Sequence, residues 1–429
     1  MHCKLHFKKV SLEAFELKSL GAKKNKNIKN HQLKVLFEIW LKKHLKYTTM
    51  DFNLTEEHLM IQQAARDFAQ NELLPGVIER DEKQIFPTEQ VKKMGELGFM
   101  GMMVDPKYGG SGLDAISYVI AMEEISKIDA SASVVMSVNN SLVCWGLQEY
   151  GTEEQKQKYL PGLASGEIHG AFCLSEPEAG SDATSQKTTA VDMGDHYLVN
   201  GTKNWITNGN TASVYLVIAQ THPELKHKGI NALIMTKDMP GFAVGPKEQK
   251  MGIRGSDTHS LMFTDVKVPK ENRIGEDGFG FKFAMKTLAG GRIGIASQAL
   301  GIASGAYELA LKYSKERKAF GTEICNHQAI AFKLADMAVN IEAARHLCMK
   351  AAWDKDQHKN YDVSGAMAKL FASQVAMDTS VEAVQIHGGN GYVKEYHVER
   401  LMRDAKITQI YEGTSEIQKI VISRAVIAG

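Results

Sequence analysis

The spacing of hydrophobic residues divides most of this chain into three stretches. From Thr55 to about Gly166 the apolar residues recur at a helical period, and from about Ala171 to Asp277 they alternate with a period near two. From Gly278 to the C-terminus the helical period returns. The pattern therefore predicts a helical domain, a small β domain and a second helical domain, in that order along the chain.

The two helical stretches contain start signals and core faces. Thr55-Glu56-Glu57 is typical of an N-cap followed by acidic residues in the first turn, where the helix dipole favours them. Gly, Ala and Ser are dense between 294 and 310, which permits close approach of helices. Two further sets of residues at helical spacing predict the core faces of a bundle: Ile330, Leu334, Met337, Ile341 and Cys348, and then Ala366, Leu370, Met377 and Val381.

The middle stretch has the pattern of short strands separated by turns. Its segments 214–218, 232–235 and 261–263 are rich in β-branched, aromatic and other apolar residues. Turn-forming sequences separate the strands, among them 193–195 (Met-Gly-Asp) and 208–210 (Asn-Gly-Asn). These features predict an antiparallel β domain of roughly 100 residues, a common size for one domain.

Residues 1–49 form a basic extension that differs from everything after it. They contain twelve Lys, three Glu and no Arg or Asp, which gives a net charge of +9. A mitochondrial transit peptide would be rich in Arg and Ser. We expect Met50 to be the true start, with residues 1–49 either a mis-assigned extension or a disordered tail. The expected domains are then residues 50–170 (helical), 171–278 (β) and 279–429 (helical bundle).

The charge and the cysteine content limit the classes of partner and the cellular compartment that we expect. The total charge of +1 leaves −8 on residues 50–429, and an acidic body disfavours nucleic acid as the main partner. The sequence has no run of roughly 18 uncharged apolar residues, so no membrane span is expected. Its five Cys residues form no CxxC pair, which indicates a reducing cytoplasm and no metal site.

A glycine-rich loop raises one alternative fold. Residues 110–115, Gly-Ser-Gly-Leu-Asp-Ala, match the loosened GxGxxA pattern of dinucleotide-binding domains. That pattern requires a buried strand directly before it and a βαβ unit around it. Here Asp-Pro-Lys-Tyr at 105–108 precedes it inside a helical region, so we expect an ordinary loop that leads into a helix.

Five motifs that could carry chemistry follow one another along the chain. Loops with hydroxyls and free backbone amides can bind a polar heterocycle or a phosphate, and glycines let a bound group approach the backbone. In the last motif Ser415 and Gln418 predict a capping box, which puts Glu412 on the loop entering a helix. The motifs are 173–182 (Cys-Leu-Ser-Glu-Pro-Glu-Ala-Gly-Ser-Asp), 205–209 (Trp-Ile-Thr-Asn-Gly), 317–321 (Arg-Lys-Ala-Phe-Gly), 385–392 (Gln-Ile-His-Gly-Gly-Asn-Gly-Tyr) and 410–418 (Ile-Tyr-Glu-Gly-Thr-Ser-Glu-Ile-Gln).

Together, and at this spacing, the motifs closely resemble the acyl-CoA dehydrogenase family over residues 51–429. The family fold is an N-terminal all-α domain, a central antiparallel β-barrel-like domain and a C-terminal four-helix bundle, in agreement with the periodicity. The resemblance implies a flavoprotein that binds FAD and acyl-CoA and passes electrons to electron-transfer flavoprotein. It also implies an oligomer, usually a homotetramer, whose subunits share their FAD sites.

The resemblance assigns further residues to the cofactor and the substrate. The flavin would be contacted by Leu174, Ser175, Trp205, Ile206 and Thr207. The FAD of a neighbouring subunit would be reached by Arg317, Phe320, Gln328, Gln385, Ile386, His387, Gly388 and Gly389. The distal half of FAD would be held by Thr414, Ser415 and Glu416, and the acyl-CoA by Ser181, Arg292 and Gly413. Of these, His387 is expected to be a packed or cofactor-adjacent side chain rather than an acid or base.

Glu412 matches the catalytic base of the family. Removing the weakly acidic proton α to a thioester carbonyl needs a positioned carboxylate, a polarised carbonyl and a hydride acceptor. The resemblance implies that the base's own backbone N–H and a flavin hydroxyl hold the carbonyl, that the flavin accepts the β-hydride, and that the product is a trans-2-enoyl-CoA. From spacing alone, Glu412 could also be a surface carboxylate or a cap.

Sequence differences between members of the family indicate which class of substrate we expect. In isovaleryl-type and long-chain members the base stands next to the arginine matched by Arg292, where this chain has Gly291. The stretches after Arg292 and around Glu412 look most like short-chain, butyryl-type enzymes of fatty-acid β-oxidation or branched amino-acid catabolism. Short branched-chain and medium-chain substrates are the alternatives.

Ala289 bears on those alternatives. It stands where short-chain members carry an aspartate, near the expected start of a CoA-binding helix, and it could weaken binding or shift the chain-length preference.

An alternative of another class is a DNA-binding member of the same fold, without enzymatic activity. The retained Glu412 and the acidic body count against it.

Overall fold

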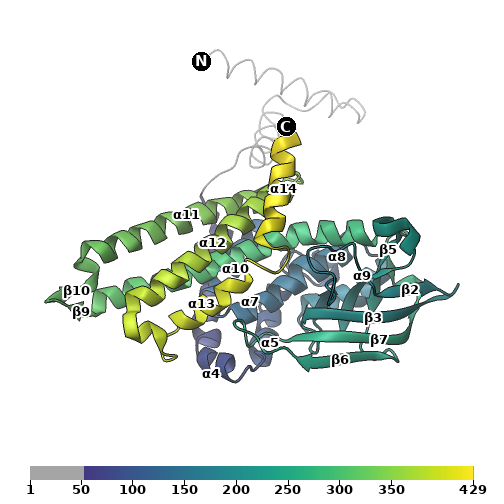
Figure 1. The fold of residues 1–429 in the computed structure, drawn as a ribbon, viewed down its shortest axis with the longest axis horizontal. Coiled ribbons are helices and arrows are strands. Elements are labelled where there is room, and N and C mark those ends of the chain that lie inside the picture. The colour runs from purple at the N-terminus through teal and green to yellow at the C-terminus, as the bar shows by residue number, and fades with distance from the viewer. Residues whose placement is uncertain (1–52, 429) are drawn as a thin grey trace, which may run out of the picture. The chain divides into compact units, whose positions relative to one another are not determined.

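The structure is a computed structural model that describes residues 53–428 (Figure 1). The predictions for residues 1–49 and Met50 lie outside the described residues. From Thr55 onward the chain forms helices, then strands, then helices, which is the order that the hydrophobic pattern predicts. Within the described residues no helix combines the length and the apolar character that crossing a membrane requires.

The N-terminal helices begin where the sequence predicts a cap. The Thr55 hydroxyl accepts a hydrogen bond from the backbone N–H of His58, and Nδ1 of His58 accepts one from the backbone N–H of Thr55. This reciprocal pair closes the first turn of α3. The helices are α3 (Glu56–Phe68), α4 (Val77–Glu82), α5 (Thr88–Glu96), α6 (Ala115–Ser126), α7 (Ala130–Ser137), α8 (Trp145–Tyr150) and α9 (Glu153–Ala164), with π-helical η1 (Ala69–Leu73) and η4 (Val138–Cys144) between them.

The glycine-rich loop at 110–115 is an ordinary helix entry. The Asp114 carboxylate accepts a hydrogen bond from the backbone N–H of Ser117 and caps α6. A 3-10 turn, Pro106–Tyr108, precedes the loop, and the first strand of the described chain starts only at Gly170. The dinucleotide-binding alternative is therefore excluded.

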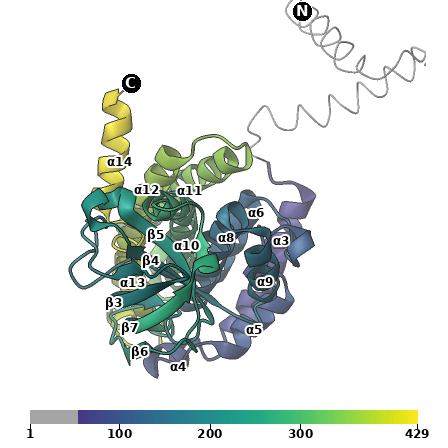
Figure 2. The ribbon, with the colours of Figure 1, turned by 90° about the vertical axis from the view of Figure 1, so that its right-hand side faces the viewer.

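The middle of the chain forms one eight-stranded sheet in the order β6-β7-β3-β2-β4-β5-β8, with β1 paired to β4. Three predicted segments are confirmed as parts of β4, β5 and β7. Most pairs are antiparallel as predicted, but β1 runs parallel to β4 and one residue pair joins β2 to β4 in parallel. Figure 2 shows the strands in front, with helices α3, α5 and α9 beside them. The strands are β1 (Gly170–Cys173), β2 (Thr189–Asp192), β3 (His196–Thr207), β4 (Val214–Gln220), β5 (Ile230–Met235), β6 (Phe242–Lys247), β7 (Thr258–Pro269) and β8 (Arg273–Ile274).

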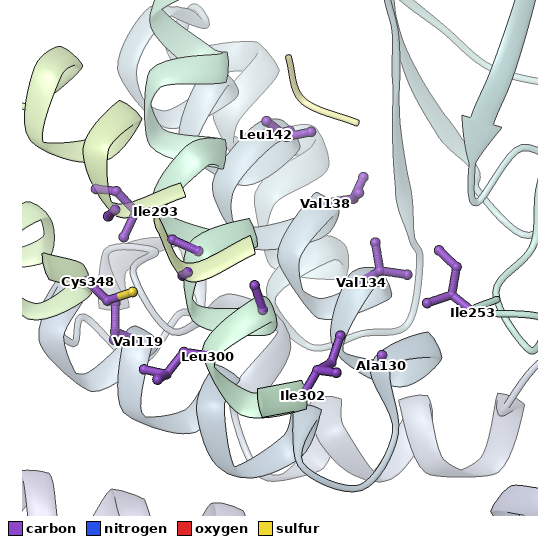
Figure 3. Packing of buried hydrophobic residues seen from close by; sticks show 14 of the residues in the cluster. Val119, Ala130, Val134, Val138, Leu142, Ile253, Ile293, Leu300, Ile302 and Cys348 are labelled. Atoms are coloured by element: carbon purple, nitrogen blue, oxygen red, sulfur yellow. The ribbon is translucent and has the colours of Figure 1, made fainter. Parts of the chain in front are cut away.

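The C-terminal part is a helical bundle around α10. Its side chains Ile293, Leu300 and Ile302 pack with Val119 of α6 and Val134 of α7 in the largest core cluster (Figure 3). This packing joins the bundle to the N-terminal helices. The helices are α10 (Gly280–Glu316), α11 (Gln328–Asp356), α12 (Asp362–His387), α13 (Val398–Ile407) and α14 (Ser415–Ala428), and the short strands β9 (Lys318–Ala319) and β10 (Thr322–Glu323) form a hairpin between α10 and α11.

One of the two predicted core faces is confirmed, and the other is confirmed only in part. On α11 the predicted residues from Leu334 to Cys348 are buried. On α12 the predicted Ala366 is buried, but Val381 is 43% exposed, and the buried face consists mostly of small residues. The small residues let α10 pack closely on α12: a Cβ added at Gly365 would already be in van der Waals contact with the carbonyl of Ala289, at 3.5 Å.

Ala289 lies inside α10 rather than near a helix start. The helix begins at Gly280, so the expectation of a helix start near Ala289 is wrong. The residue is buried, with the glycine of α12 at position 365 against its carbonyl. An aspartate at this position would place a charge between two closely packed helices, which is costly without a partner. Alanine therefore suits the packing of this chain.

Candidate active site

Glu412 lies on a short loop between α13 and α14 whose backbone has an unusual conformation. Glu412 has φ +52° and Gly413 has φ +94°. The left-handed region is uncommon for a residue with a side chain and persists only where the surroundings hold it. The loop must therefore be fixed by its neighbours.

Three side chains from three helices hold this loop. The Tyr411 hydroxyl donates to Oε1 of Gln298 on α10, whose amide in turn donates to the Ala130 carbonyl at 2.9 Å. On the other side the Gly413 carbonyl accepts hydrogen bonds from Nε2 of Gln418 on α14 at 2.8 Å and from Nζ of Lys369 on α12. The residues on both sides of Glu412 are thus tied to different helices.

The predicted capping box of Ser415 and Gln418 is wrong. The hydroxyl that accepts from the first turn of α14 belongs to Thr414, which receives the backbone N–H of Ile417 at 3.4 Å. The backbone N–H of Ser415 donates to the Gln409 carbonyl at 3.0 Å. Gln418 is turned toward Gly413 instead, because that carbonyl needs a donor once the loop takes its left-handed conformation.

The Glu412 carboxylate is directed against the backbone of α10. A side chain added at Gly291 would come within 2.1 Å of Oε2 of Glu412 and 2.7 Å of a methyl of Leu142. The absence of a side chain at Gly291 therefore leaves the room that the carboxylate fills. Position 291, the alternative place for a base, and Glu412 meet at one point of the fold.

Burial without a hydrogen-bond partner sets the chemistry of Glu412. Its Oε2 is enclosed and has no hydrogen-bond donor among the described residues. Burial raises the pKa of Glu412 to about 7, while the charges of Lys369 and Arg292 act in the opposite direction. A carboxyl with a pKa near neutral can take up and release a proton under physiological conditions, which is what a general base requires.

Arg292, the predicted CoA contact, follows Gly291 on α10. It is 8% exposed, and its Nε has no hydrogen-bond partner among the described residues. Burial lowers its pKa, and the charges of Asp362 and Glu412 raise it. An arginine in this state has donors left for a ligand that carries acceptor oxygens.

The predicted flavin contacts of the β domain lie next to one another. The backbone N–H of Asn204 donates to the Ser175 carbonyl at 2.9 Å, which joins the loop of Leu174 to the end of β3. Trp205 is 58% exposed with φ +57°, an uncommon state for a large aromatic side chain. Ile206 is buried in the core, and Thr207 is half-buried at the strand end.

A buried ion pair fixes this loop. Nζ of Lys203 on β3 donates to the Leu174 carbonyl at 3.1 Å and to Oε1 of Glu176 at 2.7 Å. Glu176 also accepts the backbone N–H groups of Lys187 and Thr188. The ion pair therefore connects both ends of the 174–188 loop to the strand that presents Trp205. The predicted CoA contact Ser181 is exposed on this loop.

The predicted contacts to a neighbouring FAD gather at the far end of the bundle. Phe320, at the tip of the β9–β10 hairpin, is 97% exposed with φ +53°. His387 is buried, as predicted for a packed residue, with its Nδ1 2.7 Å from the Ala383 carbonyl and its ring stacked on Tyr313 at 4.2 Å. Ile386 is buried beside it. The other predicted members are exposed: Arg317, Gln328, Gln385, Gly388 and Gly389.

The two groups of predicted FAD contacts are not brought together within one chain. Figure 1 shows the β9–β10 hairpin and strand β3 at opposite ends of the described part. The helix α10 that connects the two regions has 37 residues, roughly 55 Å at 1.5 Å per residue. The third group, Thr414, Ser415 and Glu416, lies beside Glu412 at the start of α14.

Several residues of the site were missed by the sequence patterns. Lys369 and Lys203 are buried and contact the loops described above. For Lys369 the available signal was a lysine inside an alanine-rich helix, where a charged residue needs a partner. In the described residues no group of three or more His, Cys, Asp or Glu side chains could hold a metal ion.

Comparisons with known proteins agree with this geometry. Three family models match consecutive parts of the chain: the N-terminal domain of acyl-CoA dehydrogenases at residues 55–167, the middle domain at 171–266 and the C-terminal domain at 278–427. A relative from Clostridium acetobutylicum, named acyl-CoA dehydrogenase, short-chain specific, is 54% identical over 374 residues, which is 87% of this chain and 99% of the relative.

Solved structures give the same result. The structure of butyryl-CoA dehydrogenase from Megasphaera elsdenii matches with a TM-score of 0.87 and 49% identity, over 88% of this chain and 100% of that chain. A solved chain described with the electron transferring flavoprotein of Acidaminococcus fermentans matches with a TM-score of 0.88 and 52% identity, over 89% of this chain and 100% of that chain.

Proposed function

The chain belongs to the acyl-CoA dehydrogenase family, and from this membership we propose that Glu412 is the base with which it dehydrogenates a short-chain acyl-CoA to the trans-2-enoyl-CoA. The observation that carries the assignment is the enclosed, unpartnered Oε2 of Glu412 against Gly291. The pKa of Glu412 is near 7, and side chains of three helices hold the loop on which it lies.

The residues around Glu412 divide the work of the reaction. The carboxylate of Glu412 takes the proton from the α carbon of the thioester. Its loop is held rigidly, so the carboxylate is already oriented when the substrate arrives, which lowers the entropic cost of the step. Oε2 of the carboxylate lies against Gly291 of α10 and is enclosed, and a site with little water strengthens electrostatic interactions during proton transfer.

The residues present fit FAD, the cofactor of this family. Trp205 and Phe320 are aromatic side chains exposed with positive φ, and the space where Gly388 and Gly389 would carry a side chain is open. When bound, FAD supplies the acceptor for the hydride that leaves the β carbon. Leu174, Ser175, Trp205, Ile206 and Thr207 would hold its flavin. Arg317, Phe320, Gln328, Gln385, Ile386, His387, Gly388, Gly389, Thr414, Ser415 and Glu416 would hold the rest.

The separation of these contacts supports an oligomer. A single chain places strand β3, which contains Trp205, and the β9–β10 hairpin, which carries Phe320, at opposite ends of the described part (Figure 1), so a shared FAD site needs a second copy. We propose a homotetramer. The expected result of light scattering on the purified protein is four chains, and Phe320→Ala should lower the FAD content. A monomer that retains FAD would contradict this assembly.

Short-chain substrates are the proposed class, because the Clostridium and Megasphaera relatives are named for short-chain and butyryl substrates. Ser181, Arg292 and Gly413 would contact the acyl-CoA. The test is anaerobic mixing of the yellow holoenzyme with acyl-CoAs from C4 to C16 and with isobutyryl-CoA. Butyryl-CoA should bleach the flavin fastest. Faster bleaching by a longer or branched thioester would overturn the short-chain assignment, and a protein that takes up no FAD would overturn the enzymatic one.

The proposed electron acceptor is electron-transfer flavoprotein. The support is the 52% identical solved chain described with the electron transferring flavoprotein of Acidaminococcus fermentans. The reduced holoenzyme should reduce an added electron-transfer flavoprotein faster than it reduces oxygen. Faster reaction with oxygen would point to an oxidase.

We also propose that the protein acts in the cytoplasm. The support is chemical: Cys144, Cys173 and Cys348 are unpaired thiols buried in the core, as expected for a reducing compartment. Fractionation of the source cells should recover the activity with cytoplasmic markers, and recovery with an organelle or the cell envelope would contradict it.

A further inference from the structure

Lys369 is a buried lysine that the mechanism above does not use. It lies on α12 and is 1% exposed, and its Nζ donates to the Gly413 carbonyl. Burial lowers the pKa of Lys369 to about 8, so the amine is still mostly protonated at neutral pH. A buried ammonium is costly unless it is paired, so the contacts of Lys369 must offset this cost.

The contact of Lys369 is with the residue that follows Glu412. The Gly413 carbonyl accepts from Nζ of Lys369 and from Nε2 of Gln418, which come from α12 and α14 respectively. Two donors from two helices fix the orientation of one peptide group. This carbonyl belongs to the peptide that joins Gly413 to Thr414, directly after the two residues with positive φ. Fixing it therefore limits the movement of the backbone that carries Glu412.

The charges that face Glu412 come from several elements. Arg292 of α10 and Lys369 of α12 both favour the ionised carboxylate, while the phenols of Tyr118 on α6 and the adjacent Tyr411 are neutral. Lys369 in turn faces Glu416 of α14, and Arg292 faces Asp362, at the start of α12. Of the two cations, only Lys369 is hydrogen-bonded to the loop of Glu412 in the described chain.

We propose that Lys369 is a positioning residue for Glu412, which holds the Gly413 carbonyl and, at neutral pH, presents a positive charge to the carboxylate. This inference rests on the proposed role of Glu412 as the base. The charge of Lys369 and its hydrogen bond affect Glu412 in different ways. Losing the charge makes the carboxylate harder to ionise, whereas losing a donor alone loosens the loop.

Three variants of the holoenzyme separate these effects. Lys369→Met removes the charge and the donor, Lys369→Arg keeps both, and Gln418→Met removes the other donor to the same carbonyl without changing charge. The primary readout is infrared titration of the protonated carboxyl band that Glu412→Gln abolishes. It is recorded without substrate, so it does not depend on turnover. The second readout is the pH profile of flavin reduction by butyryl-CoA.

Lys369→Met should raise the midpoint of the Glu412 titration by about one pH unit. The pH at which the rate of flavin reduction reaches half its maximum should rise by the same amount. The rate at pH 6 then falls about tenfold further than the rate at pH 9. Lys369→Arg should restore the midpoint, and Gln418→Met should leave it unchanged while slowing the reaction at every pH. If Lys369→Met does not fold, Lys369→Gln removes the charge and retains an amide donor, and the same upward shift is expected.

An unchanged midpoint in the charge-removing variant would overturn the proposal, as would an equal shift in Gln418→Met. A shifted midpoint in a protein that does not oxidise acyl-CoA would uphold the contact between Lys369 and Glu412 and contradict the proposed function. The two failures are therefore distinguishable.

Discussion

Two carboxylates in this molecule have opposite surroundings. In the β domain Glu176 accepts hydrogen bonds from Nζ of Lys203 at 2.7 Å and from the backbone N–H of Lys187 at 2.6 Å. These contacts hold its pKa below the ordinary value despite burial. At the bundle Glu412 has an unpartnered Oε2, and burial raises its pKa to about 7.

The difference shows how one residue type serves two purposes. A buried carboxylate whose oxygens are hydrogen-bonded remains ionised. It also fixes a loop, because moving any of its partners away would leave an uncompensated buried charge. A carboxylate deprived of donors is held near its point of protonation, so it can exchange a proton with a ligand. Glu176 thus stabilises the loop that carries the flavin contacts, and Glu412 is suited to react.

The largest effect is expected for Glu412→Gln. The amide has nearly the same shape but cannot accept the α proton, so flavin reduction by butyryl-CoA should fall at least about a hundredfold and up to about ten-thousandfold. Stopped-flow absorbance of the anaerobic holoenzyme measures it. Glu89→Gln, an exposed carboxylate on α5, is the control and should keep the wild-type rate. A rate for Glu412→Gln within threefold of wild type would refute the assignment.

The opposite result is expected at the Glu176 pair, where stability rather than chemistry should suffer. Lys203→Met leaves Glu176 as an uncompensated buried charge, which should cost about 3–5 kcal/mol and loosen the FAD. Thermal unfolding and the flavin content of the purified protein measure these effects. The control is Glu178→Gln, which breaks the exposed pair with Lys187 and should leave the Tm almost unchanged, because exposed ion pairs contribute little. Equal Tm values for the two variants would mean that the buried pair does not stabilise the loop.

A methyl group at position 291 should disturb Glu412 directly. Gly291→Ala would place a carbon 2.1 Å from Oε2, so the carboxylate must move, and a displacement of about 1 Å can cost about a hundredfold in rate. Gly290→Ala is a matched control, because its nearest neighbour would be 3.7 Å away. Both are measured by flavin reduction at saturating butyryl-CoA. Equal rates in the two variants would show that the carboxylate does not lie against α10.

The smallest effect is on stability as a function of pH. Because folding raises the pKa of Glu412, its contribution is fully present below about pH 4.5 and is lost as pH rises through about 7. The Tm of wild type should therefore fall relative to Glu412→Gln between pH 5 and 8, by an amount equivalent to less than about 3 kcal/mol. Glu176, with its lowered pKa, contributes above pH 4.5 and loses that contribution only in acid. A constant difference in Tm across this range would contradict the raised pKa of Glu412.

The sequence predicts what depends on local patterns. The cap at Thr55 and the strands around 214–218 and 261–263 are set by neighbouring residues, and all of them are confirmed. The face of α12 was predicted wrongly at Val381, because the close approach of α10 selects small residues rather than large apolar ones. Helix packing of this kind depends on a partner distant in the sequence.

The site follows the same rule. The motif around Glu412 was visible in the sequence, but the unpartnered carboxylate, the space at Gly291 and the contact of Lys369 were not. Each depends on α10 or α12 approaching the loop from elsewhere in the chain. The misassigned cap at Ser415 has the same origin, since Gln418 is recruited by the Gly413 carbonyl rather than by the helix start.

The most direct test of the account is the pH dependence of flavin reduction at low butyryl-CoA concentration, which reports the ionisation of the free enzyme. With Glu412 as the base, the rate should rise with pH through an apparent pKa near 7, and Glu412→Gln should be at least about a hundredfold slower at every pH. A rate independent of pH between 5 and 9, or a Glu412→Gln variant with the wild-type profile, would show that another group is the base.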